Sequence, residues 1–192
     1  MTPARFRSTT LDLLKNYWRI KAANALYRST RRVTADRLEY SNVPAVGFAS
    51  NQFVSESVVD ASLALNTFVL QRLPRDLLLA LIAEFESRLV ARLRSLGQPE
   101  DGTLGALQTK IQAKTTVPPT LIEDLNELRE RRNAMIHHAD IAGAKYVAAS
   151  TSVLPRAAHF IKVTSVGDNV SPTEGYLAYA ADVLVRYSDA IG

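Results

Sequence analysis

Apolar side chains recur at helical spacing along most of the chain, and this pattern predicts a protein built from helices. The clearest example lies between residues 75 and 96, where apolar positions return to one face at about 100° per residue. The members of this stripe are Leu78, Leu81, Ile82, Phe85, Leu89, Leu93 and Leu96. Pro74 suits the first turn of a helix, and Gly97 and Pro99 mark its end. We therefore expect a new helix to begin at Pro74.

Weaker stripes of the same kind predict further helices over about residues 8–29, 56–70, 104–114, 120–138, 141–154 and 171–190. The apolar face of the first comprises Leu11, Leu14, Trp18, Ala22, Ala25 and Leu26. Thr120 and Glu123 match a capping box at the start of the helix over 120–138. A short β-like turn is expected around residues 161–168, before the last helix.

Residues 31–55 break the helical pattern. Val33–Ala35 and the stretch around Pro44 and Gly47 indicate an extended or looped connector, which would suit a short strand. The expected fold class is therefore all-α: a helical bundle with an irregular N-terminal insertion. We expect residues 1–55 to form a basic helix and connector, and residues 56–192 to form the bundle.

The composition is that of a globular protein. Hydrophobic residues make up 47% of the 192 residues and charged residues 22%, which excludes wholesale disorder. Cysteine is absent, which excludes disulfides and thiol nucleophiles and suits a reducing cytoplasm. The longest apolar run, Leu77–Ala83, is far shorter than the roughly 20 residues of a membrane span. No signal peptide is expected, and a cytoplasmic location without membrane contact is predicted.

The excess positive charge lies at the N-terminal end. Residues 1–37 carry nine basic and two acidic side chains, a net +7, whereas the whole chain carries +4. Arg28, Arg31 and Arg32 lie in this segment near aromatic residues such as Tyr27. Such a segment is suited to contact with an RNA backbone, and a solvated helix face is the plain alternative.

The residues with the strongest chemical signal are Arg131–His138, with the sequence Arg-Arg-Asn-Ala-Met-Ile-His-His. On a helical wheel Arg132 lies within the stripe formed by Leu121, Leu125, Leu128 and Ile136, where a charge requires a partner or a cleft. His137 follows Arg132 after four intervening residues, which joins a permanent cation to a side chain that titrates near neutrality. Histidine can move protons and arginine can stabilise phosphate charge, so these residue types suit RNA cleavage without a metal.

The Arg132-Asn133-x3-His137 pattern resembles the Arg-x4–6-His motif of the HEPN (higher eukaryote and prokaryote nucleotide-binding) superfamily. The stripe from Leu78 to Leu96 is similar to an early core helix of that family, and Gly167–Tyr187 to its closing turn and helix. The resemblance covers about residues 56–190. It implies a helical bundle that forms a homodimer, with both copies of the motif facing one cleft. It also implies a metal-independent endoribonuclease that acts in toxin–antitoxin systems, phage defence or RNA processing.

The resemblance further implies roles for individual residues. Arg132 would stabilise the phosphate, His137 would transfer the proton and Asn133 would support both. Glu86, at the edge of the stripe over 75–96, is the candidate acidic partner of Arg132. Arg131 and His138 are secondary candidates for contact with RNA. No cofactor is expected, and an antitoxin or a defence protein is the expected protein partner.

Several alternatives remain open. Ala139 stands where members paired with nucleotidyltransferase antitoxins often carry a tyrosine, which argues against that pairing. In a straight helix Arg132 and His137 diverge by about 140°, so we expect either the helix to end or bend near His137 or a second protomer to complete the site. The motif is also compatible with a buried ion pair and a helix-capping histidine, or with a HEPN module that only dimerises or binds partners. A nucleic-acid-binding protein that uses residues 1–37 is a third option. A metal site at His137-His138-x-Asp140 lacks a third ligand at suitable spacing.

Overall fold

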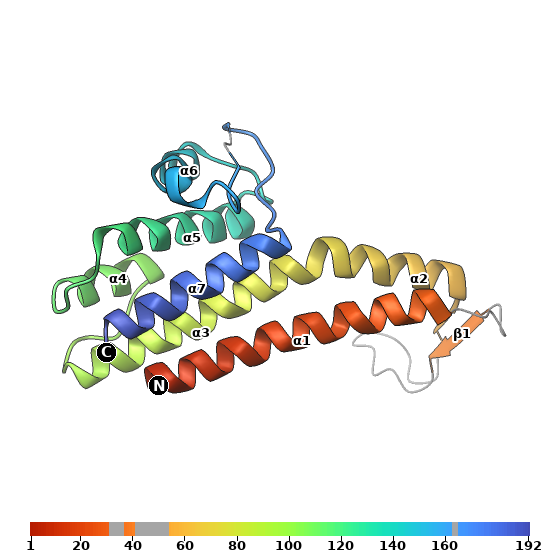
Figure 1. Ribbon diagram of the computed structural model, residues 1–192, viewed down its shortest axis with the longest axis horizontal. Coiled ribbons are helices and arrows are strands. Elements are labelled where there is room, and N and C mark those ends of the chain that lie inside the picture. The colour runs from red at the N-terminus through yellow and green to blue at the C-terminus, as the bar shows by residue number, and fades with distance from the viewer. Residues whose placement is uncertain (31–36, 41–53, 163–164) are drawn as a thin grey trace. The chain divides into compact units, whose positions relative to one another are not determined.

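The computed structural model describes residues 1–30, 37–40, 54–162 and 165–192 (Figure 1). The elements, in chain order, are α1 (Pro3–Thr30), β1 (Arg37–Tyr40), β2 (Val54–Ser57), α2 (Val58–Thr67), the π-helical turn η1 (Phe68–Arg72), α3 (Leu73–Ser95), α4 (Leu104–Gln112), α5 (Pro119–His137), α6 (Ala144–Ala157) and α7 (Glu174–Ala190). Helices dominate, so the predicted all-α class is confirmed. The only sheet among the described residues is the antiparallel pair β1–β2, in which Arg37 lies opposite Ser57. Val33–Ala35, Pro44 and Gly47 lie outside the described residues.

The chain divides into two compact units, and the division differs from the predicted boundary at residue 55. The larger unit combines Met1–Tyr17 with Pro74–Gly192, and the smaller unit is Trp18–Leu73. The start of α1 belongs to the larger unit because Phe6 is fully buried against Phe85, with ring centroids 5.8 Å apart. The N-terminal helix is therefore not a separate arm along its whole length.

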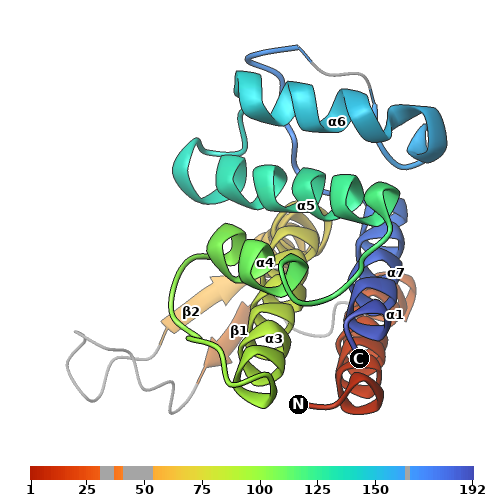
Figure 2. The same cartoon turned by 90° about the vertical axis from the view of Figure 1, so that its left-hand side faces the viewer.

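The core of the larger unit is built on α3, as the hydrophobic pattern predicts. Leu78, Phe85 and Leu93 are fully buried, and Phe85 packs edge-on against Tyr187 of α7 with ring centroids 5.5 Å apart. Figures 1 and 2 show α3 and α7 side by side, with α5 running across them and α6 packed on the outer side of α5. This arrangement places α5, which carries the arginine–histidine motif, between α7 and α6.

The apolar face predicted for α1 is wrong. Leu11, Trp18 and Leu26 are each at least half exposed, whereas Phe6 and Tyr17 are buried. Phe6 and Tyr17 are eleven residues apart, about three helical turns, and therefore share one face. Phe6 and Tyr17 therefore define the buried face, and Trp18, the largest side chain of the predicted face, is exposed. Although α1 is 28 residues long, neither it nor another helix in the described part of the chain is long and apolar enough to cross a membrane.

The smaller unit contains the second half of α1, the two strands, α2 and η1. Within it, Arg28 of α1 donates a hydrogen bond from Nη1 to Oδ1 of Asn66 in α2, at 3.0 Å. Val69 is buried, but Leu63 and Leu70 are largely exposed. The apolar surface of this unit is therefore only partly covered by its own described residues.

Pro74 does not restart a helix, contrary to the prediction. α2, η1 and α3 follow one another without a break, and the backbone N–H of Leu73 donates to the carbonyl of Phe68 five residues earlier. Proline lacks an N–H and crowds the preceding turn, and a widened π turn is one way in which a helix accommodates this. The wide turn immediately before Pro74 therefore replaces the predicted helix boundary.

Two other helix boundaries differ from the predictions by a few residues. α5 begins at Pro119 without a side-chain cap, so the predicted capping box of Thr120 and Glu123 is wrong. Proline at the first helical position already has the required backbone angle and needs no donor partner there. α6 begins at Ala144 rather than near 141, because Ile141 forms a β-bridge with Asn169.

Candidate functional site

The arginine inside the buried face of α5 is Arg131, and the placement predicted for Arg132 is wrong. Arg131 is 5% exposed, and Glu127, one helical turn earlier, is completely buried. Ile136, which the prediction placed in the same stripe as Arg132, is 43% exposed. Leu121, Leu125 and Leu128 are buried as predicted, but the buried face extends from them toward Glu127 and Arg131 rather than toward Arg132 and Ile136.

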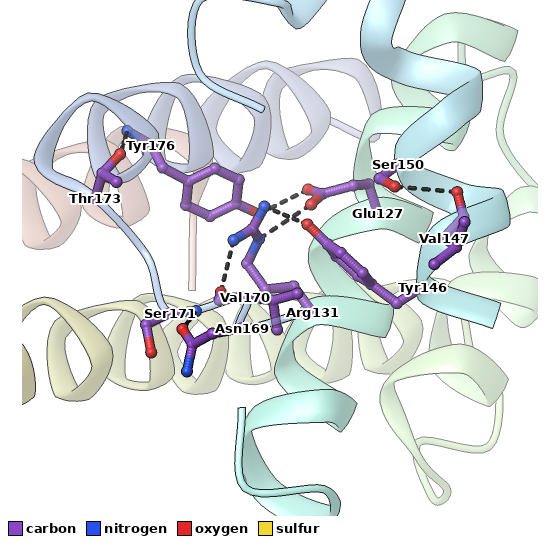
Figure 3. Close-up of polar contacts among 10 residues, drawn as sticks. All are labelled: Glu127, Arg131, Tyr146, Val147, Ser150, Asn169, Val170, Ser171, Thr173 and Tyr176. Carbon is purple, nitrogen blue, oxygen red and sulfur yellow. Dashed lines mark hydrogen bonds and ion pairs between the residues drawn. The ribbon is translucent and has the colours of Figure 1, made fainter. Parts of the chain in front are cut away.

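Arg131 is buried with a full set of partners, which Figure 3 shows. Its Nε donates to Oε1 of Glu127 at 3.0 Å, its Nη1 donates to the carbonyl of Val170 at 2.7 Å, and its Nη2 donates to the hydroxyl of Tyr146. The hydroxyl of Tyr176 donates to the second carboxylate oxygen of Glu127 at 2.6 Å. The guanidinium carbon also lies 3.8 Å from the ring centroid of Tyr176, within the range of cation–π contacts.

The electrostatics of this cluster favour a charged Arg131–Glu127 pair between neutral tyrosines. Burial by itself would lower the pKa of Arg131, but the surrounding oxygens of Tyr176, Glu127 and Tyr146 outweigh that effect and raise it. Burial, reinforced by the negative charge of Glu127, raises the pKa of both Tyr146 and Tyr176. The expected contact between Arg131 and RNA does not fit this placement, because the side chain is enclosed and its donors are already bound.

The sequence contains one local signal for this cluster, which the prediction from the leucine positions did not take into account. Glu127 and Arg131 are spaced i, i+4, which places them on the same helix face and allows an ion pair. The tyrosines come from α6 and from α7, 15 and 49 residues away from their partners. Their contribution is long-range and therefore has no local signature.

Arg132 lies at the edge of the helix pair formed by α3 and α5, where it meets Glu86. The Nη2 atom of Arg132 is 3.7 Å from Oε1 of Glu86, and the two side chains are each 29% exposed. The expected Glu86–Arg132 pair is therefore present. Nη1 of Arg132 is also 3.5 Å from Oδ1 of Asn133, the next residue. The structure thus gathers Glu86, Arg132 and Asn133 at one partly solvated position.

His137 and His138 are both exposed at the end of α5. His137 is the last helical residue, and His138 caps the helix through its backbone N–H, which donates to the carbonyl of Ala134. Their ring centroids are 6.4 Å apart. The helix therefore ends at His137, as one of the two sequence-based alternatives requires. In the described residues no hydrogen bond or ion pair joins Arg132 to His137.

The remaining candidates are basic residues of the N-terminal segment. Arg28 is exposed in the smaller unit, and Arg31 and Arg32 lie outside the described residues. Across the described ranges no group of three or more histidine or acidic side chains is arranged to hold a metal ion.

A scan against models of protein families, a search of curated proteins and a search of solved structures each found no match to this chain.

The two neighbouring arginines should differ sharply in their effect on stability. Arg131→Met leaves Glu127 charged, buried and unpaired, which we expect to lower the free energy of unfolding by about 3–5 kcal/mol. Arg132→Met removes a partly exposed pair and should cost at most about 1 kcal/mol. Urea unfolding of both variants measures the difference. Equal losses would contradict the assignment of Arg131 to the core.

The buried tyrosines predict that stability falls at high pH. Tyrosine titrates near pH 10 in an unfolded chain, whereas Tyr146 and Tyr176 have raised pKa values in the folded protein. The stability that the two neutral tyrosines contribute is therefore fully present below about pH 10. It is lost as the pH rises through their pKa values in the folded protein.

Urea unfolding at pH 9, 10 and 11 should show that the free energy of unfolding declines. Each tyrosine with a raised pKa adds a slope of about 1.4 kcal/mol per pH unit to this decline. Tyr176→Phe should remove the part of this pH dependence that comes from Tyr176. Tyrosinate absorbance from these two residues below pH 11 in the folded protein would refute the prediction.

Proposed function

We propose that this chain is a metal-independent endoribonuclease of the HEPN type. The observation that carries the proposal is the partly buried ion pair between Glu86 of α3 and Arg132 of α5, with the exposed His137 at the end of α5. The partly exposed guanidinium of Arg132 is available to a phosphate, and histidine is the side-chain type best suited to proton transfer near neutral pH. The resemblance of Arg132-Asn133-x3-His137 to the HEPN motif supports the same conclusion.

In the proposed reaction the 2′-hydroxyl of a ribose attacks the adjacent phosphorus. The bond between phosphorus and O2′ forms, the bond between phosphorus and O5′ breaks, and the product is a 2′,3′-cyclic phosphate that water opens to a 3′-phosphate. His137 moves the proton at the attacking hydroxyl or at the leaving O5′. Arg132 stabilises the negative charge that builds up on the phosphate oxygens. Asn133 supports the phosphate, and Glu86 holds the guanidinium until substrate arrives.

The biological setting of the proposal is a toxin or phage-defence effector in the cytoplasm. A homodimer in which two copies of the motif face one cleft would allow Arg132 and His137 of different protomers to act on one phosphate. An antitoxin or defence protein would then restrain the activity. The basic residues Arg28, Arg31 and Arg32, and the exposed His138, would add contacts to RNA outside the reacting phosphate.

A second function is a non-catalytic HEPN module that dimerises or binds a partner protein. The ion pair itself favours this alternative, because Glu86 engages the cation that the phosphate requires.

Cleavage of a mixed cellular RNA pool in EDTA tests the proposal. Wild type should produce fragments, and His137→Ala should slow their formation about 10²- to 10⁴-fold, the usual contribution of a proton-transfer residue. Arg132→Ala should slow it about 10²- to 10³-fold. His159→Ala is a matched control, because it removes an exposed histidine that follows α6 and should leave cleavage unchanged.

The melting temperature of each variant must be measured alongside, since loss of fold also abolishes cleavage. Intact RNA with folded wild type favours the non-catalytic module. Cleavage that His137→Ala leaves unaffected overturns the assignment of this residue. RNA binding that weakens steeply with salt and ignores His137→Ala would favour a nucleic-acid-binding protein.

A further inference from the structure

The chain makes a strained turn immediately after the two histidines. Ala139 and Asp140 have φ angles of 50° and 65°, in the left-handed region, and they are the only non-glycine residues with positive φ in the described part of the chain. Neither residue is of the type that adopts this region without cost, apart from the modest tolerance of aspartate. Such strain persists only where surrounding contacts enforce it, and it concentrates at functional sites.

Arg75, in the first turn of α3, is the first of these contacts. Its Nε donates to Oδ1 of Asp140 at 3.1 Å, and its Nη2 donates to the carbonyl of Met135 at 2.7 Å. Met135 lies in the last turn of α5, whose carbonyls have no partners within the helix. One guanidinium therefore binds both the end of α5 and the strained turn that follows it.

The segment before α7 provides the second contact. The hydroxyl of Ser171 donates to Oδ2 of Asp140 at 3.2 Å, and the backbone N–H of Val170 donates to the carbonyl of Asp140 at 2.8 Å. The side chain of Asp140 is only 19% exposed. Both carboxylate oxygens are thus held, one from α3 and one from the chain leading into α7.

α3 contacts the motif at two points. Arg75 and Glu86 are eleven residues apart, about three turns, so they lie on one face of α3. Glu86 meets Arg132, and Arg75 meets the turn after His138. A single rigid helix therefore fixes the position of the arginine and that of the histidines.

We propose that Arg75 and Asp140 are positioning residues that hold His137 and His138 in a fixed direction relative to Arg132. The proposal rests on the proposed ribonuclease function. Neither residue touches the reacting phosphate; both act through the backbone that carries the histidines. Without them the turn is held by backbone hydrogen bonds, such as those from His138 and Asp140 to the carbonyl of Ala134, and the imidazoles sample more directions.

Kinetics on a defined RNA oligonucleotide test this role with a matched pair of variants. Arg75 lies near two carboxylates, Asp140 at 3.1 Å and Asp76 at 4.0 Å, and only Asp140 belongs to the turn. Asp140→Asn should lower kcat about 10- to 100-fold and leave KM within threefold, because misplacement of a reacting group affects the chemical step. Asp76→Asn, which makes the same change of charge, should leave both constants within twofold.

Histidine imidazole resonances, observed by NMR in protein labelled at histidine, provide a readout that does not require cleavage. In wild type His137 and His138 should give dispersed signals, and in Arg75→Gln or Asp140→Asn these should collapse toward the signals of an unstructured peptide. Ser171→Ala, which removes a single bond to Asp140, is the milder variant if the others unfold. It should shift the same signals in the same direction.

The outcomes separate the two proposals. If wild type fails to cleave RNA, the proposed function falls, and the NMR comparison alone decides whether the histidines are held. Retention of wild-type kcat by folded Asp140→Asn overturns the positioning role, as do histidine signals unchanged in all three variants. Equal losses in Asp140→Asn and Asp76→Asn would show an effect of charge alone and would also overturn it.

Discussion

The buried ion pair between Glu127 and Arg131 is the interaction on which the arrangement of the C-terminal helices depends. Two charges removed from water are tolerable only when each is paired and its remaining hydrogen-bonding groups are satisfied. Here the remaining hydrogen bonds of the two side chains are made by Tyr146 of α6, Tyr176 of α7 and the carbonyl of Val170. Because these partners come from three places in the chain, the pair is buried with all its hydrogen bonds only when α5, α6 and α7 have assembled. It thereby fixes the rotation of α5 about its own axis.

A second buried arginine performs the corresponding task between α3 and α7. Arg88 is 2% exposed, and its donors bind the hydroxyl and the carbonyl of Ser188 and the carbonyl of Gly192. Burial and the neighbouring Arg92 lower its pKa. With α7 joined to α3 by one arginine and to α5 by the other, Glu86 and Arg132 are brought within reach of each other.

The sequence was most informative where a single helix face determines burial. The stripe of α3 was predicted almost completely, because seven large apolar residues on one face leave no competing orientation. The pair Glu86–Arg132 followed from that stripe. The face of α1 was mispredicted because Phe6 and Tyr17 are buried on another side of the helix. The face of α5 was predicted correctly at Leu121, Leu125 and Leu128, but the adjoining Glu127–Arg131 pair was missed because its tyrosine partners are distant in the chain. Arg75 and Asp140 escaped prediction since they are 65 residues apart and a left-handed backbone angle at an alanine has no sequence signature.

Adjacent arginines with opposite surroundings limit how α5 can change in length. One inserted residue between Leu121 and Glu127 would rotate everything after it by about 100° relative to the part before it. The apolar residues before the insertion and the Glu127–Arg131 pair after it could then not both face the core. Lineages of this protein should therefore accumulate insertions and deletions in the connections around α4, at residues 96–103 and 113–118, and keep the number of residues in α5 constant.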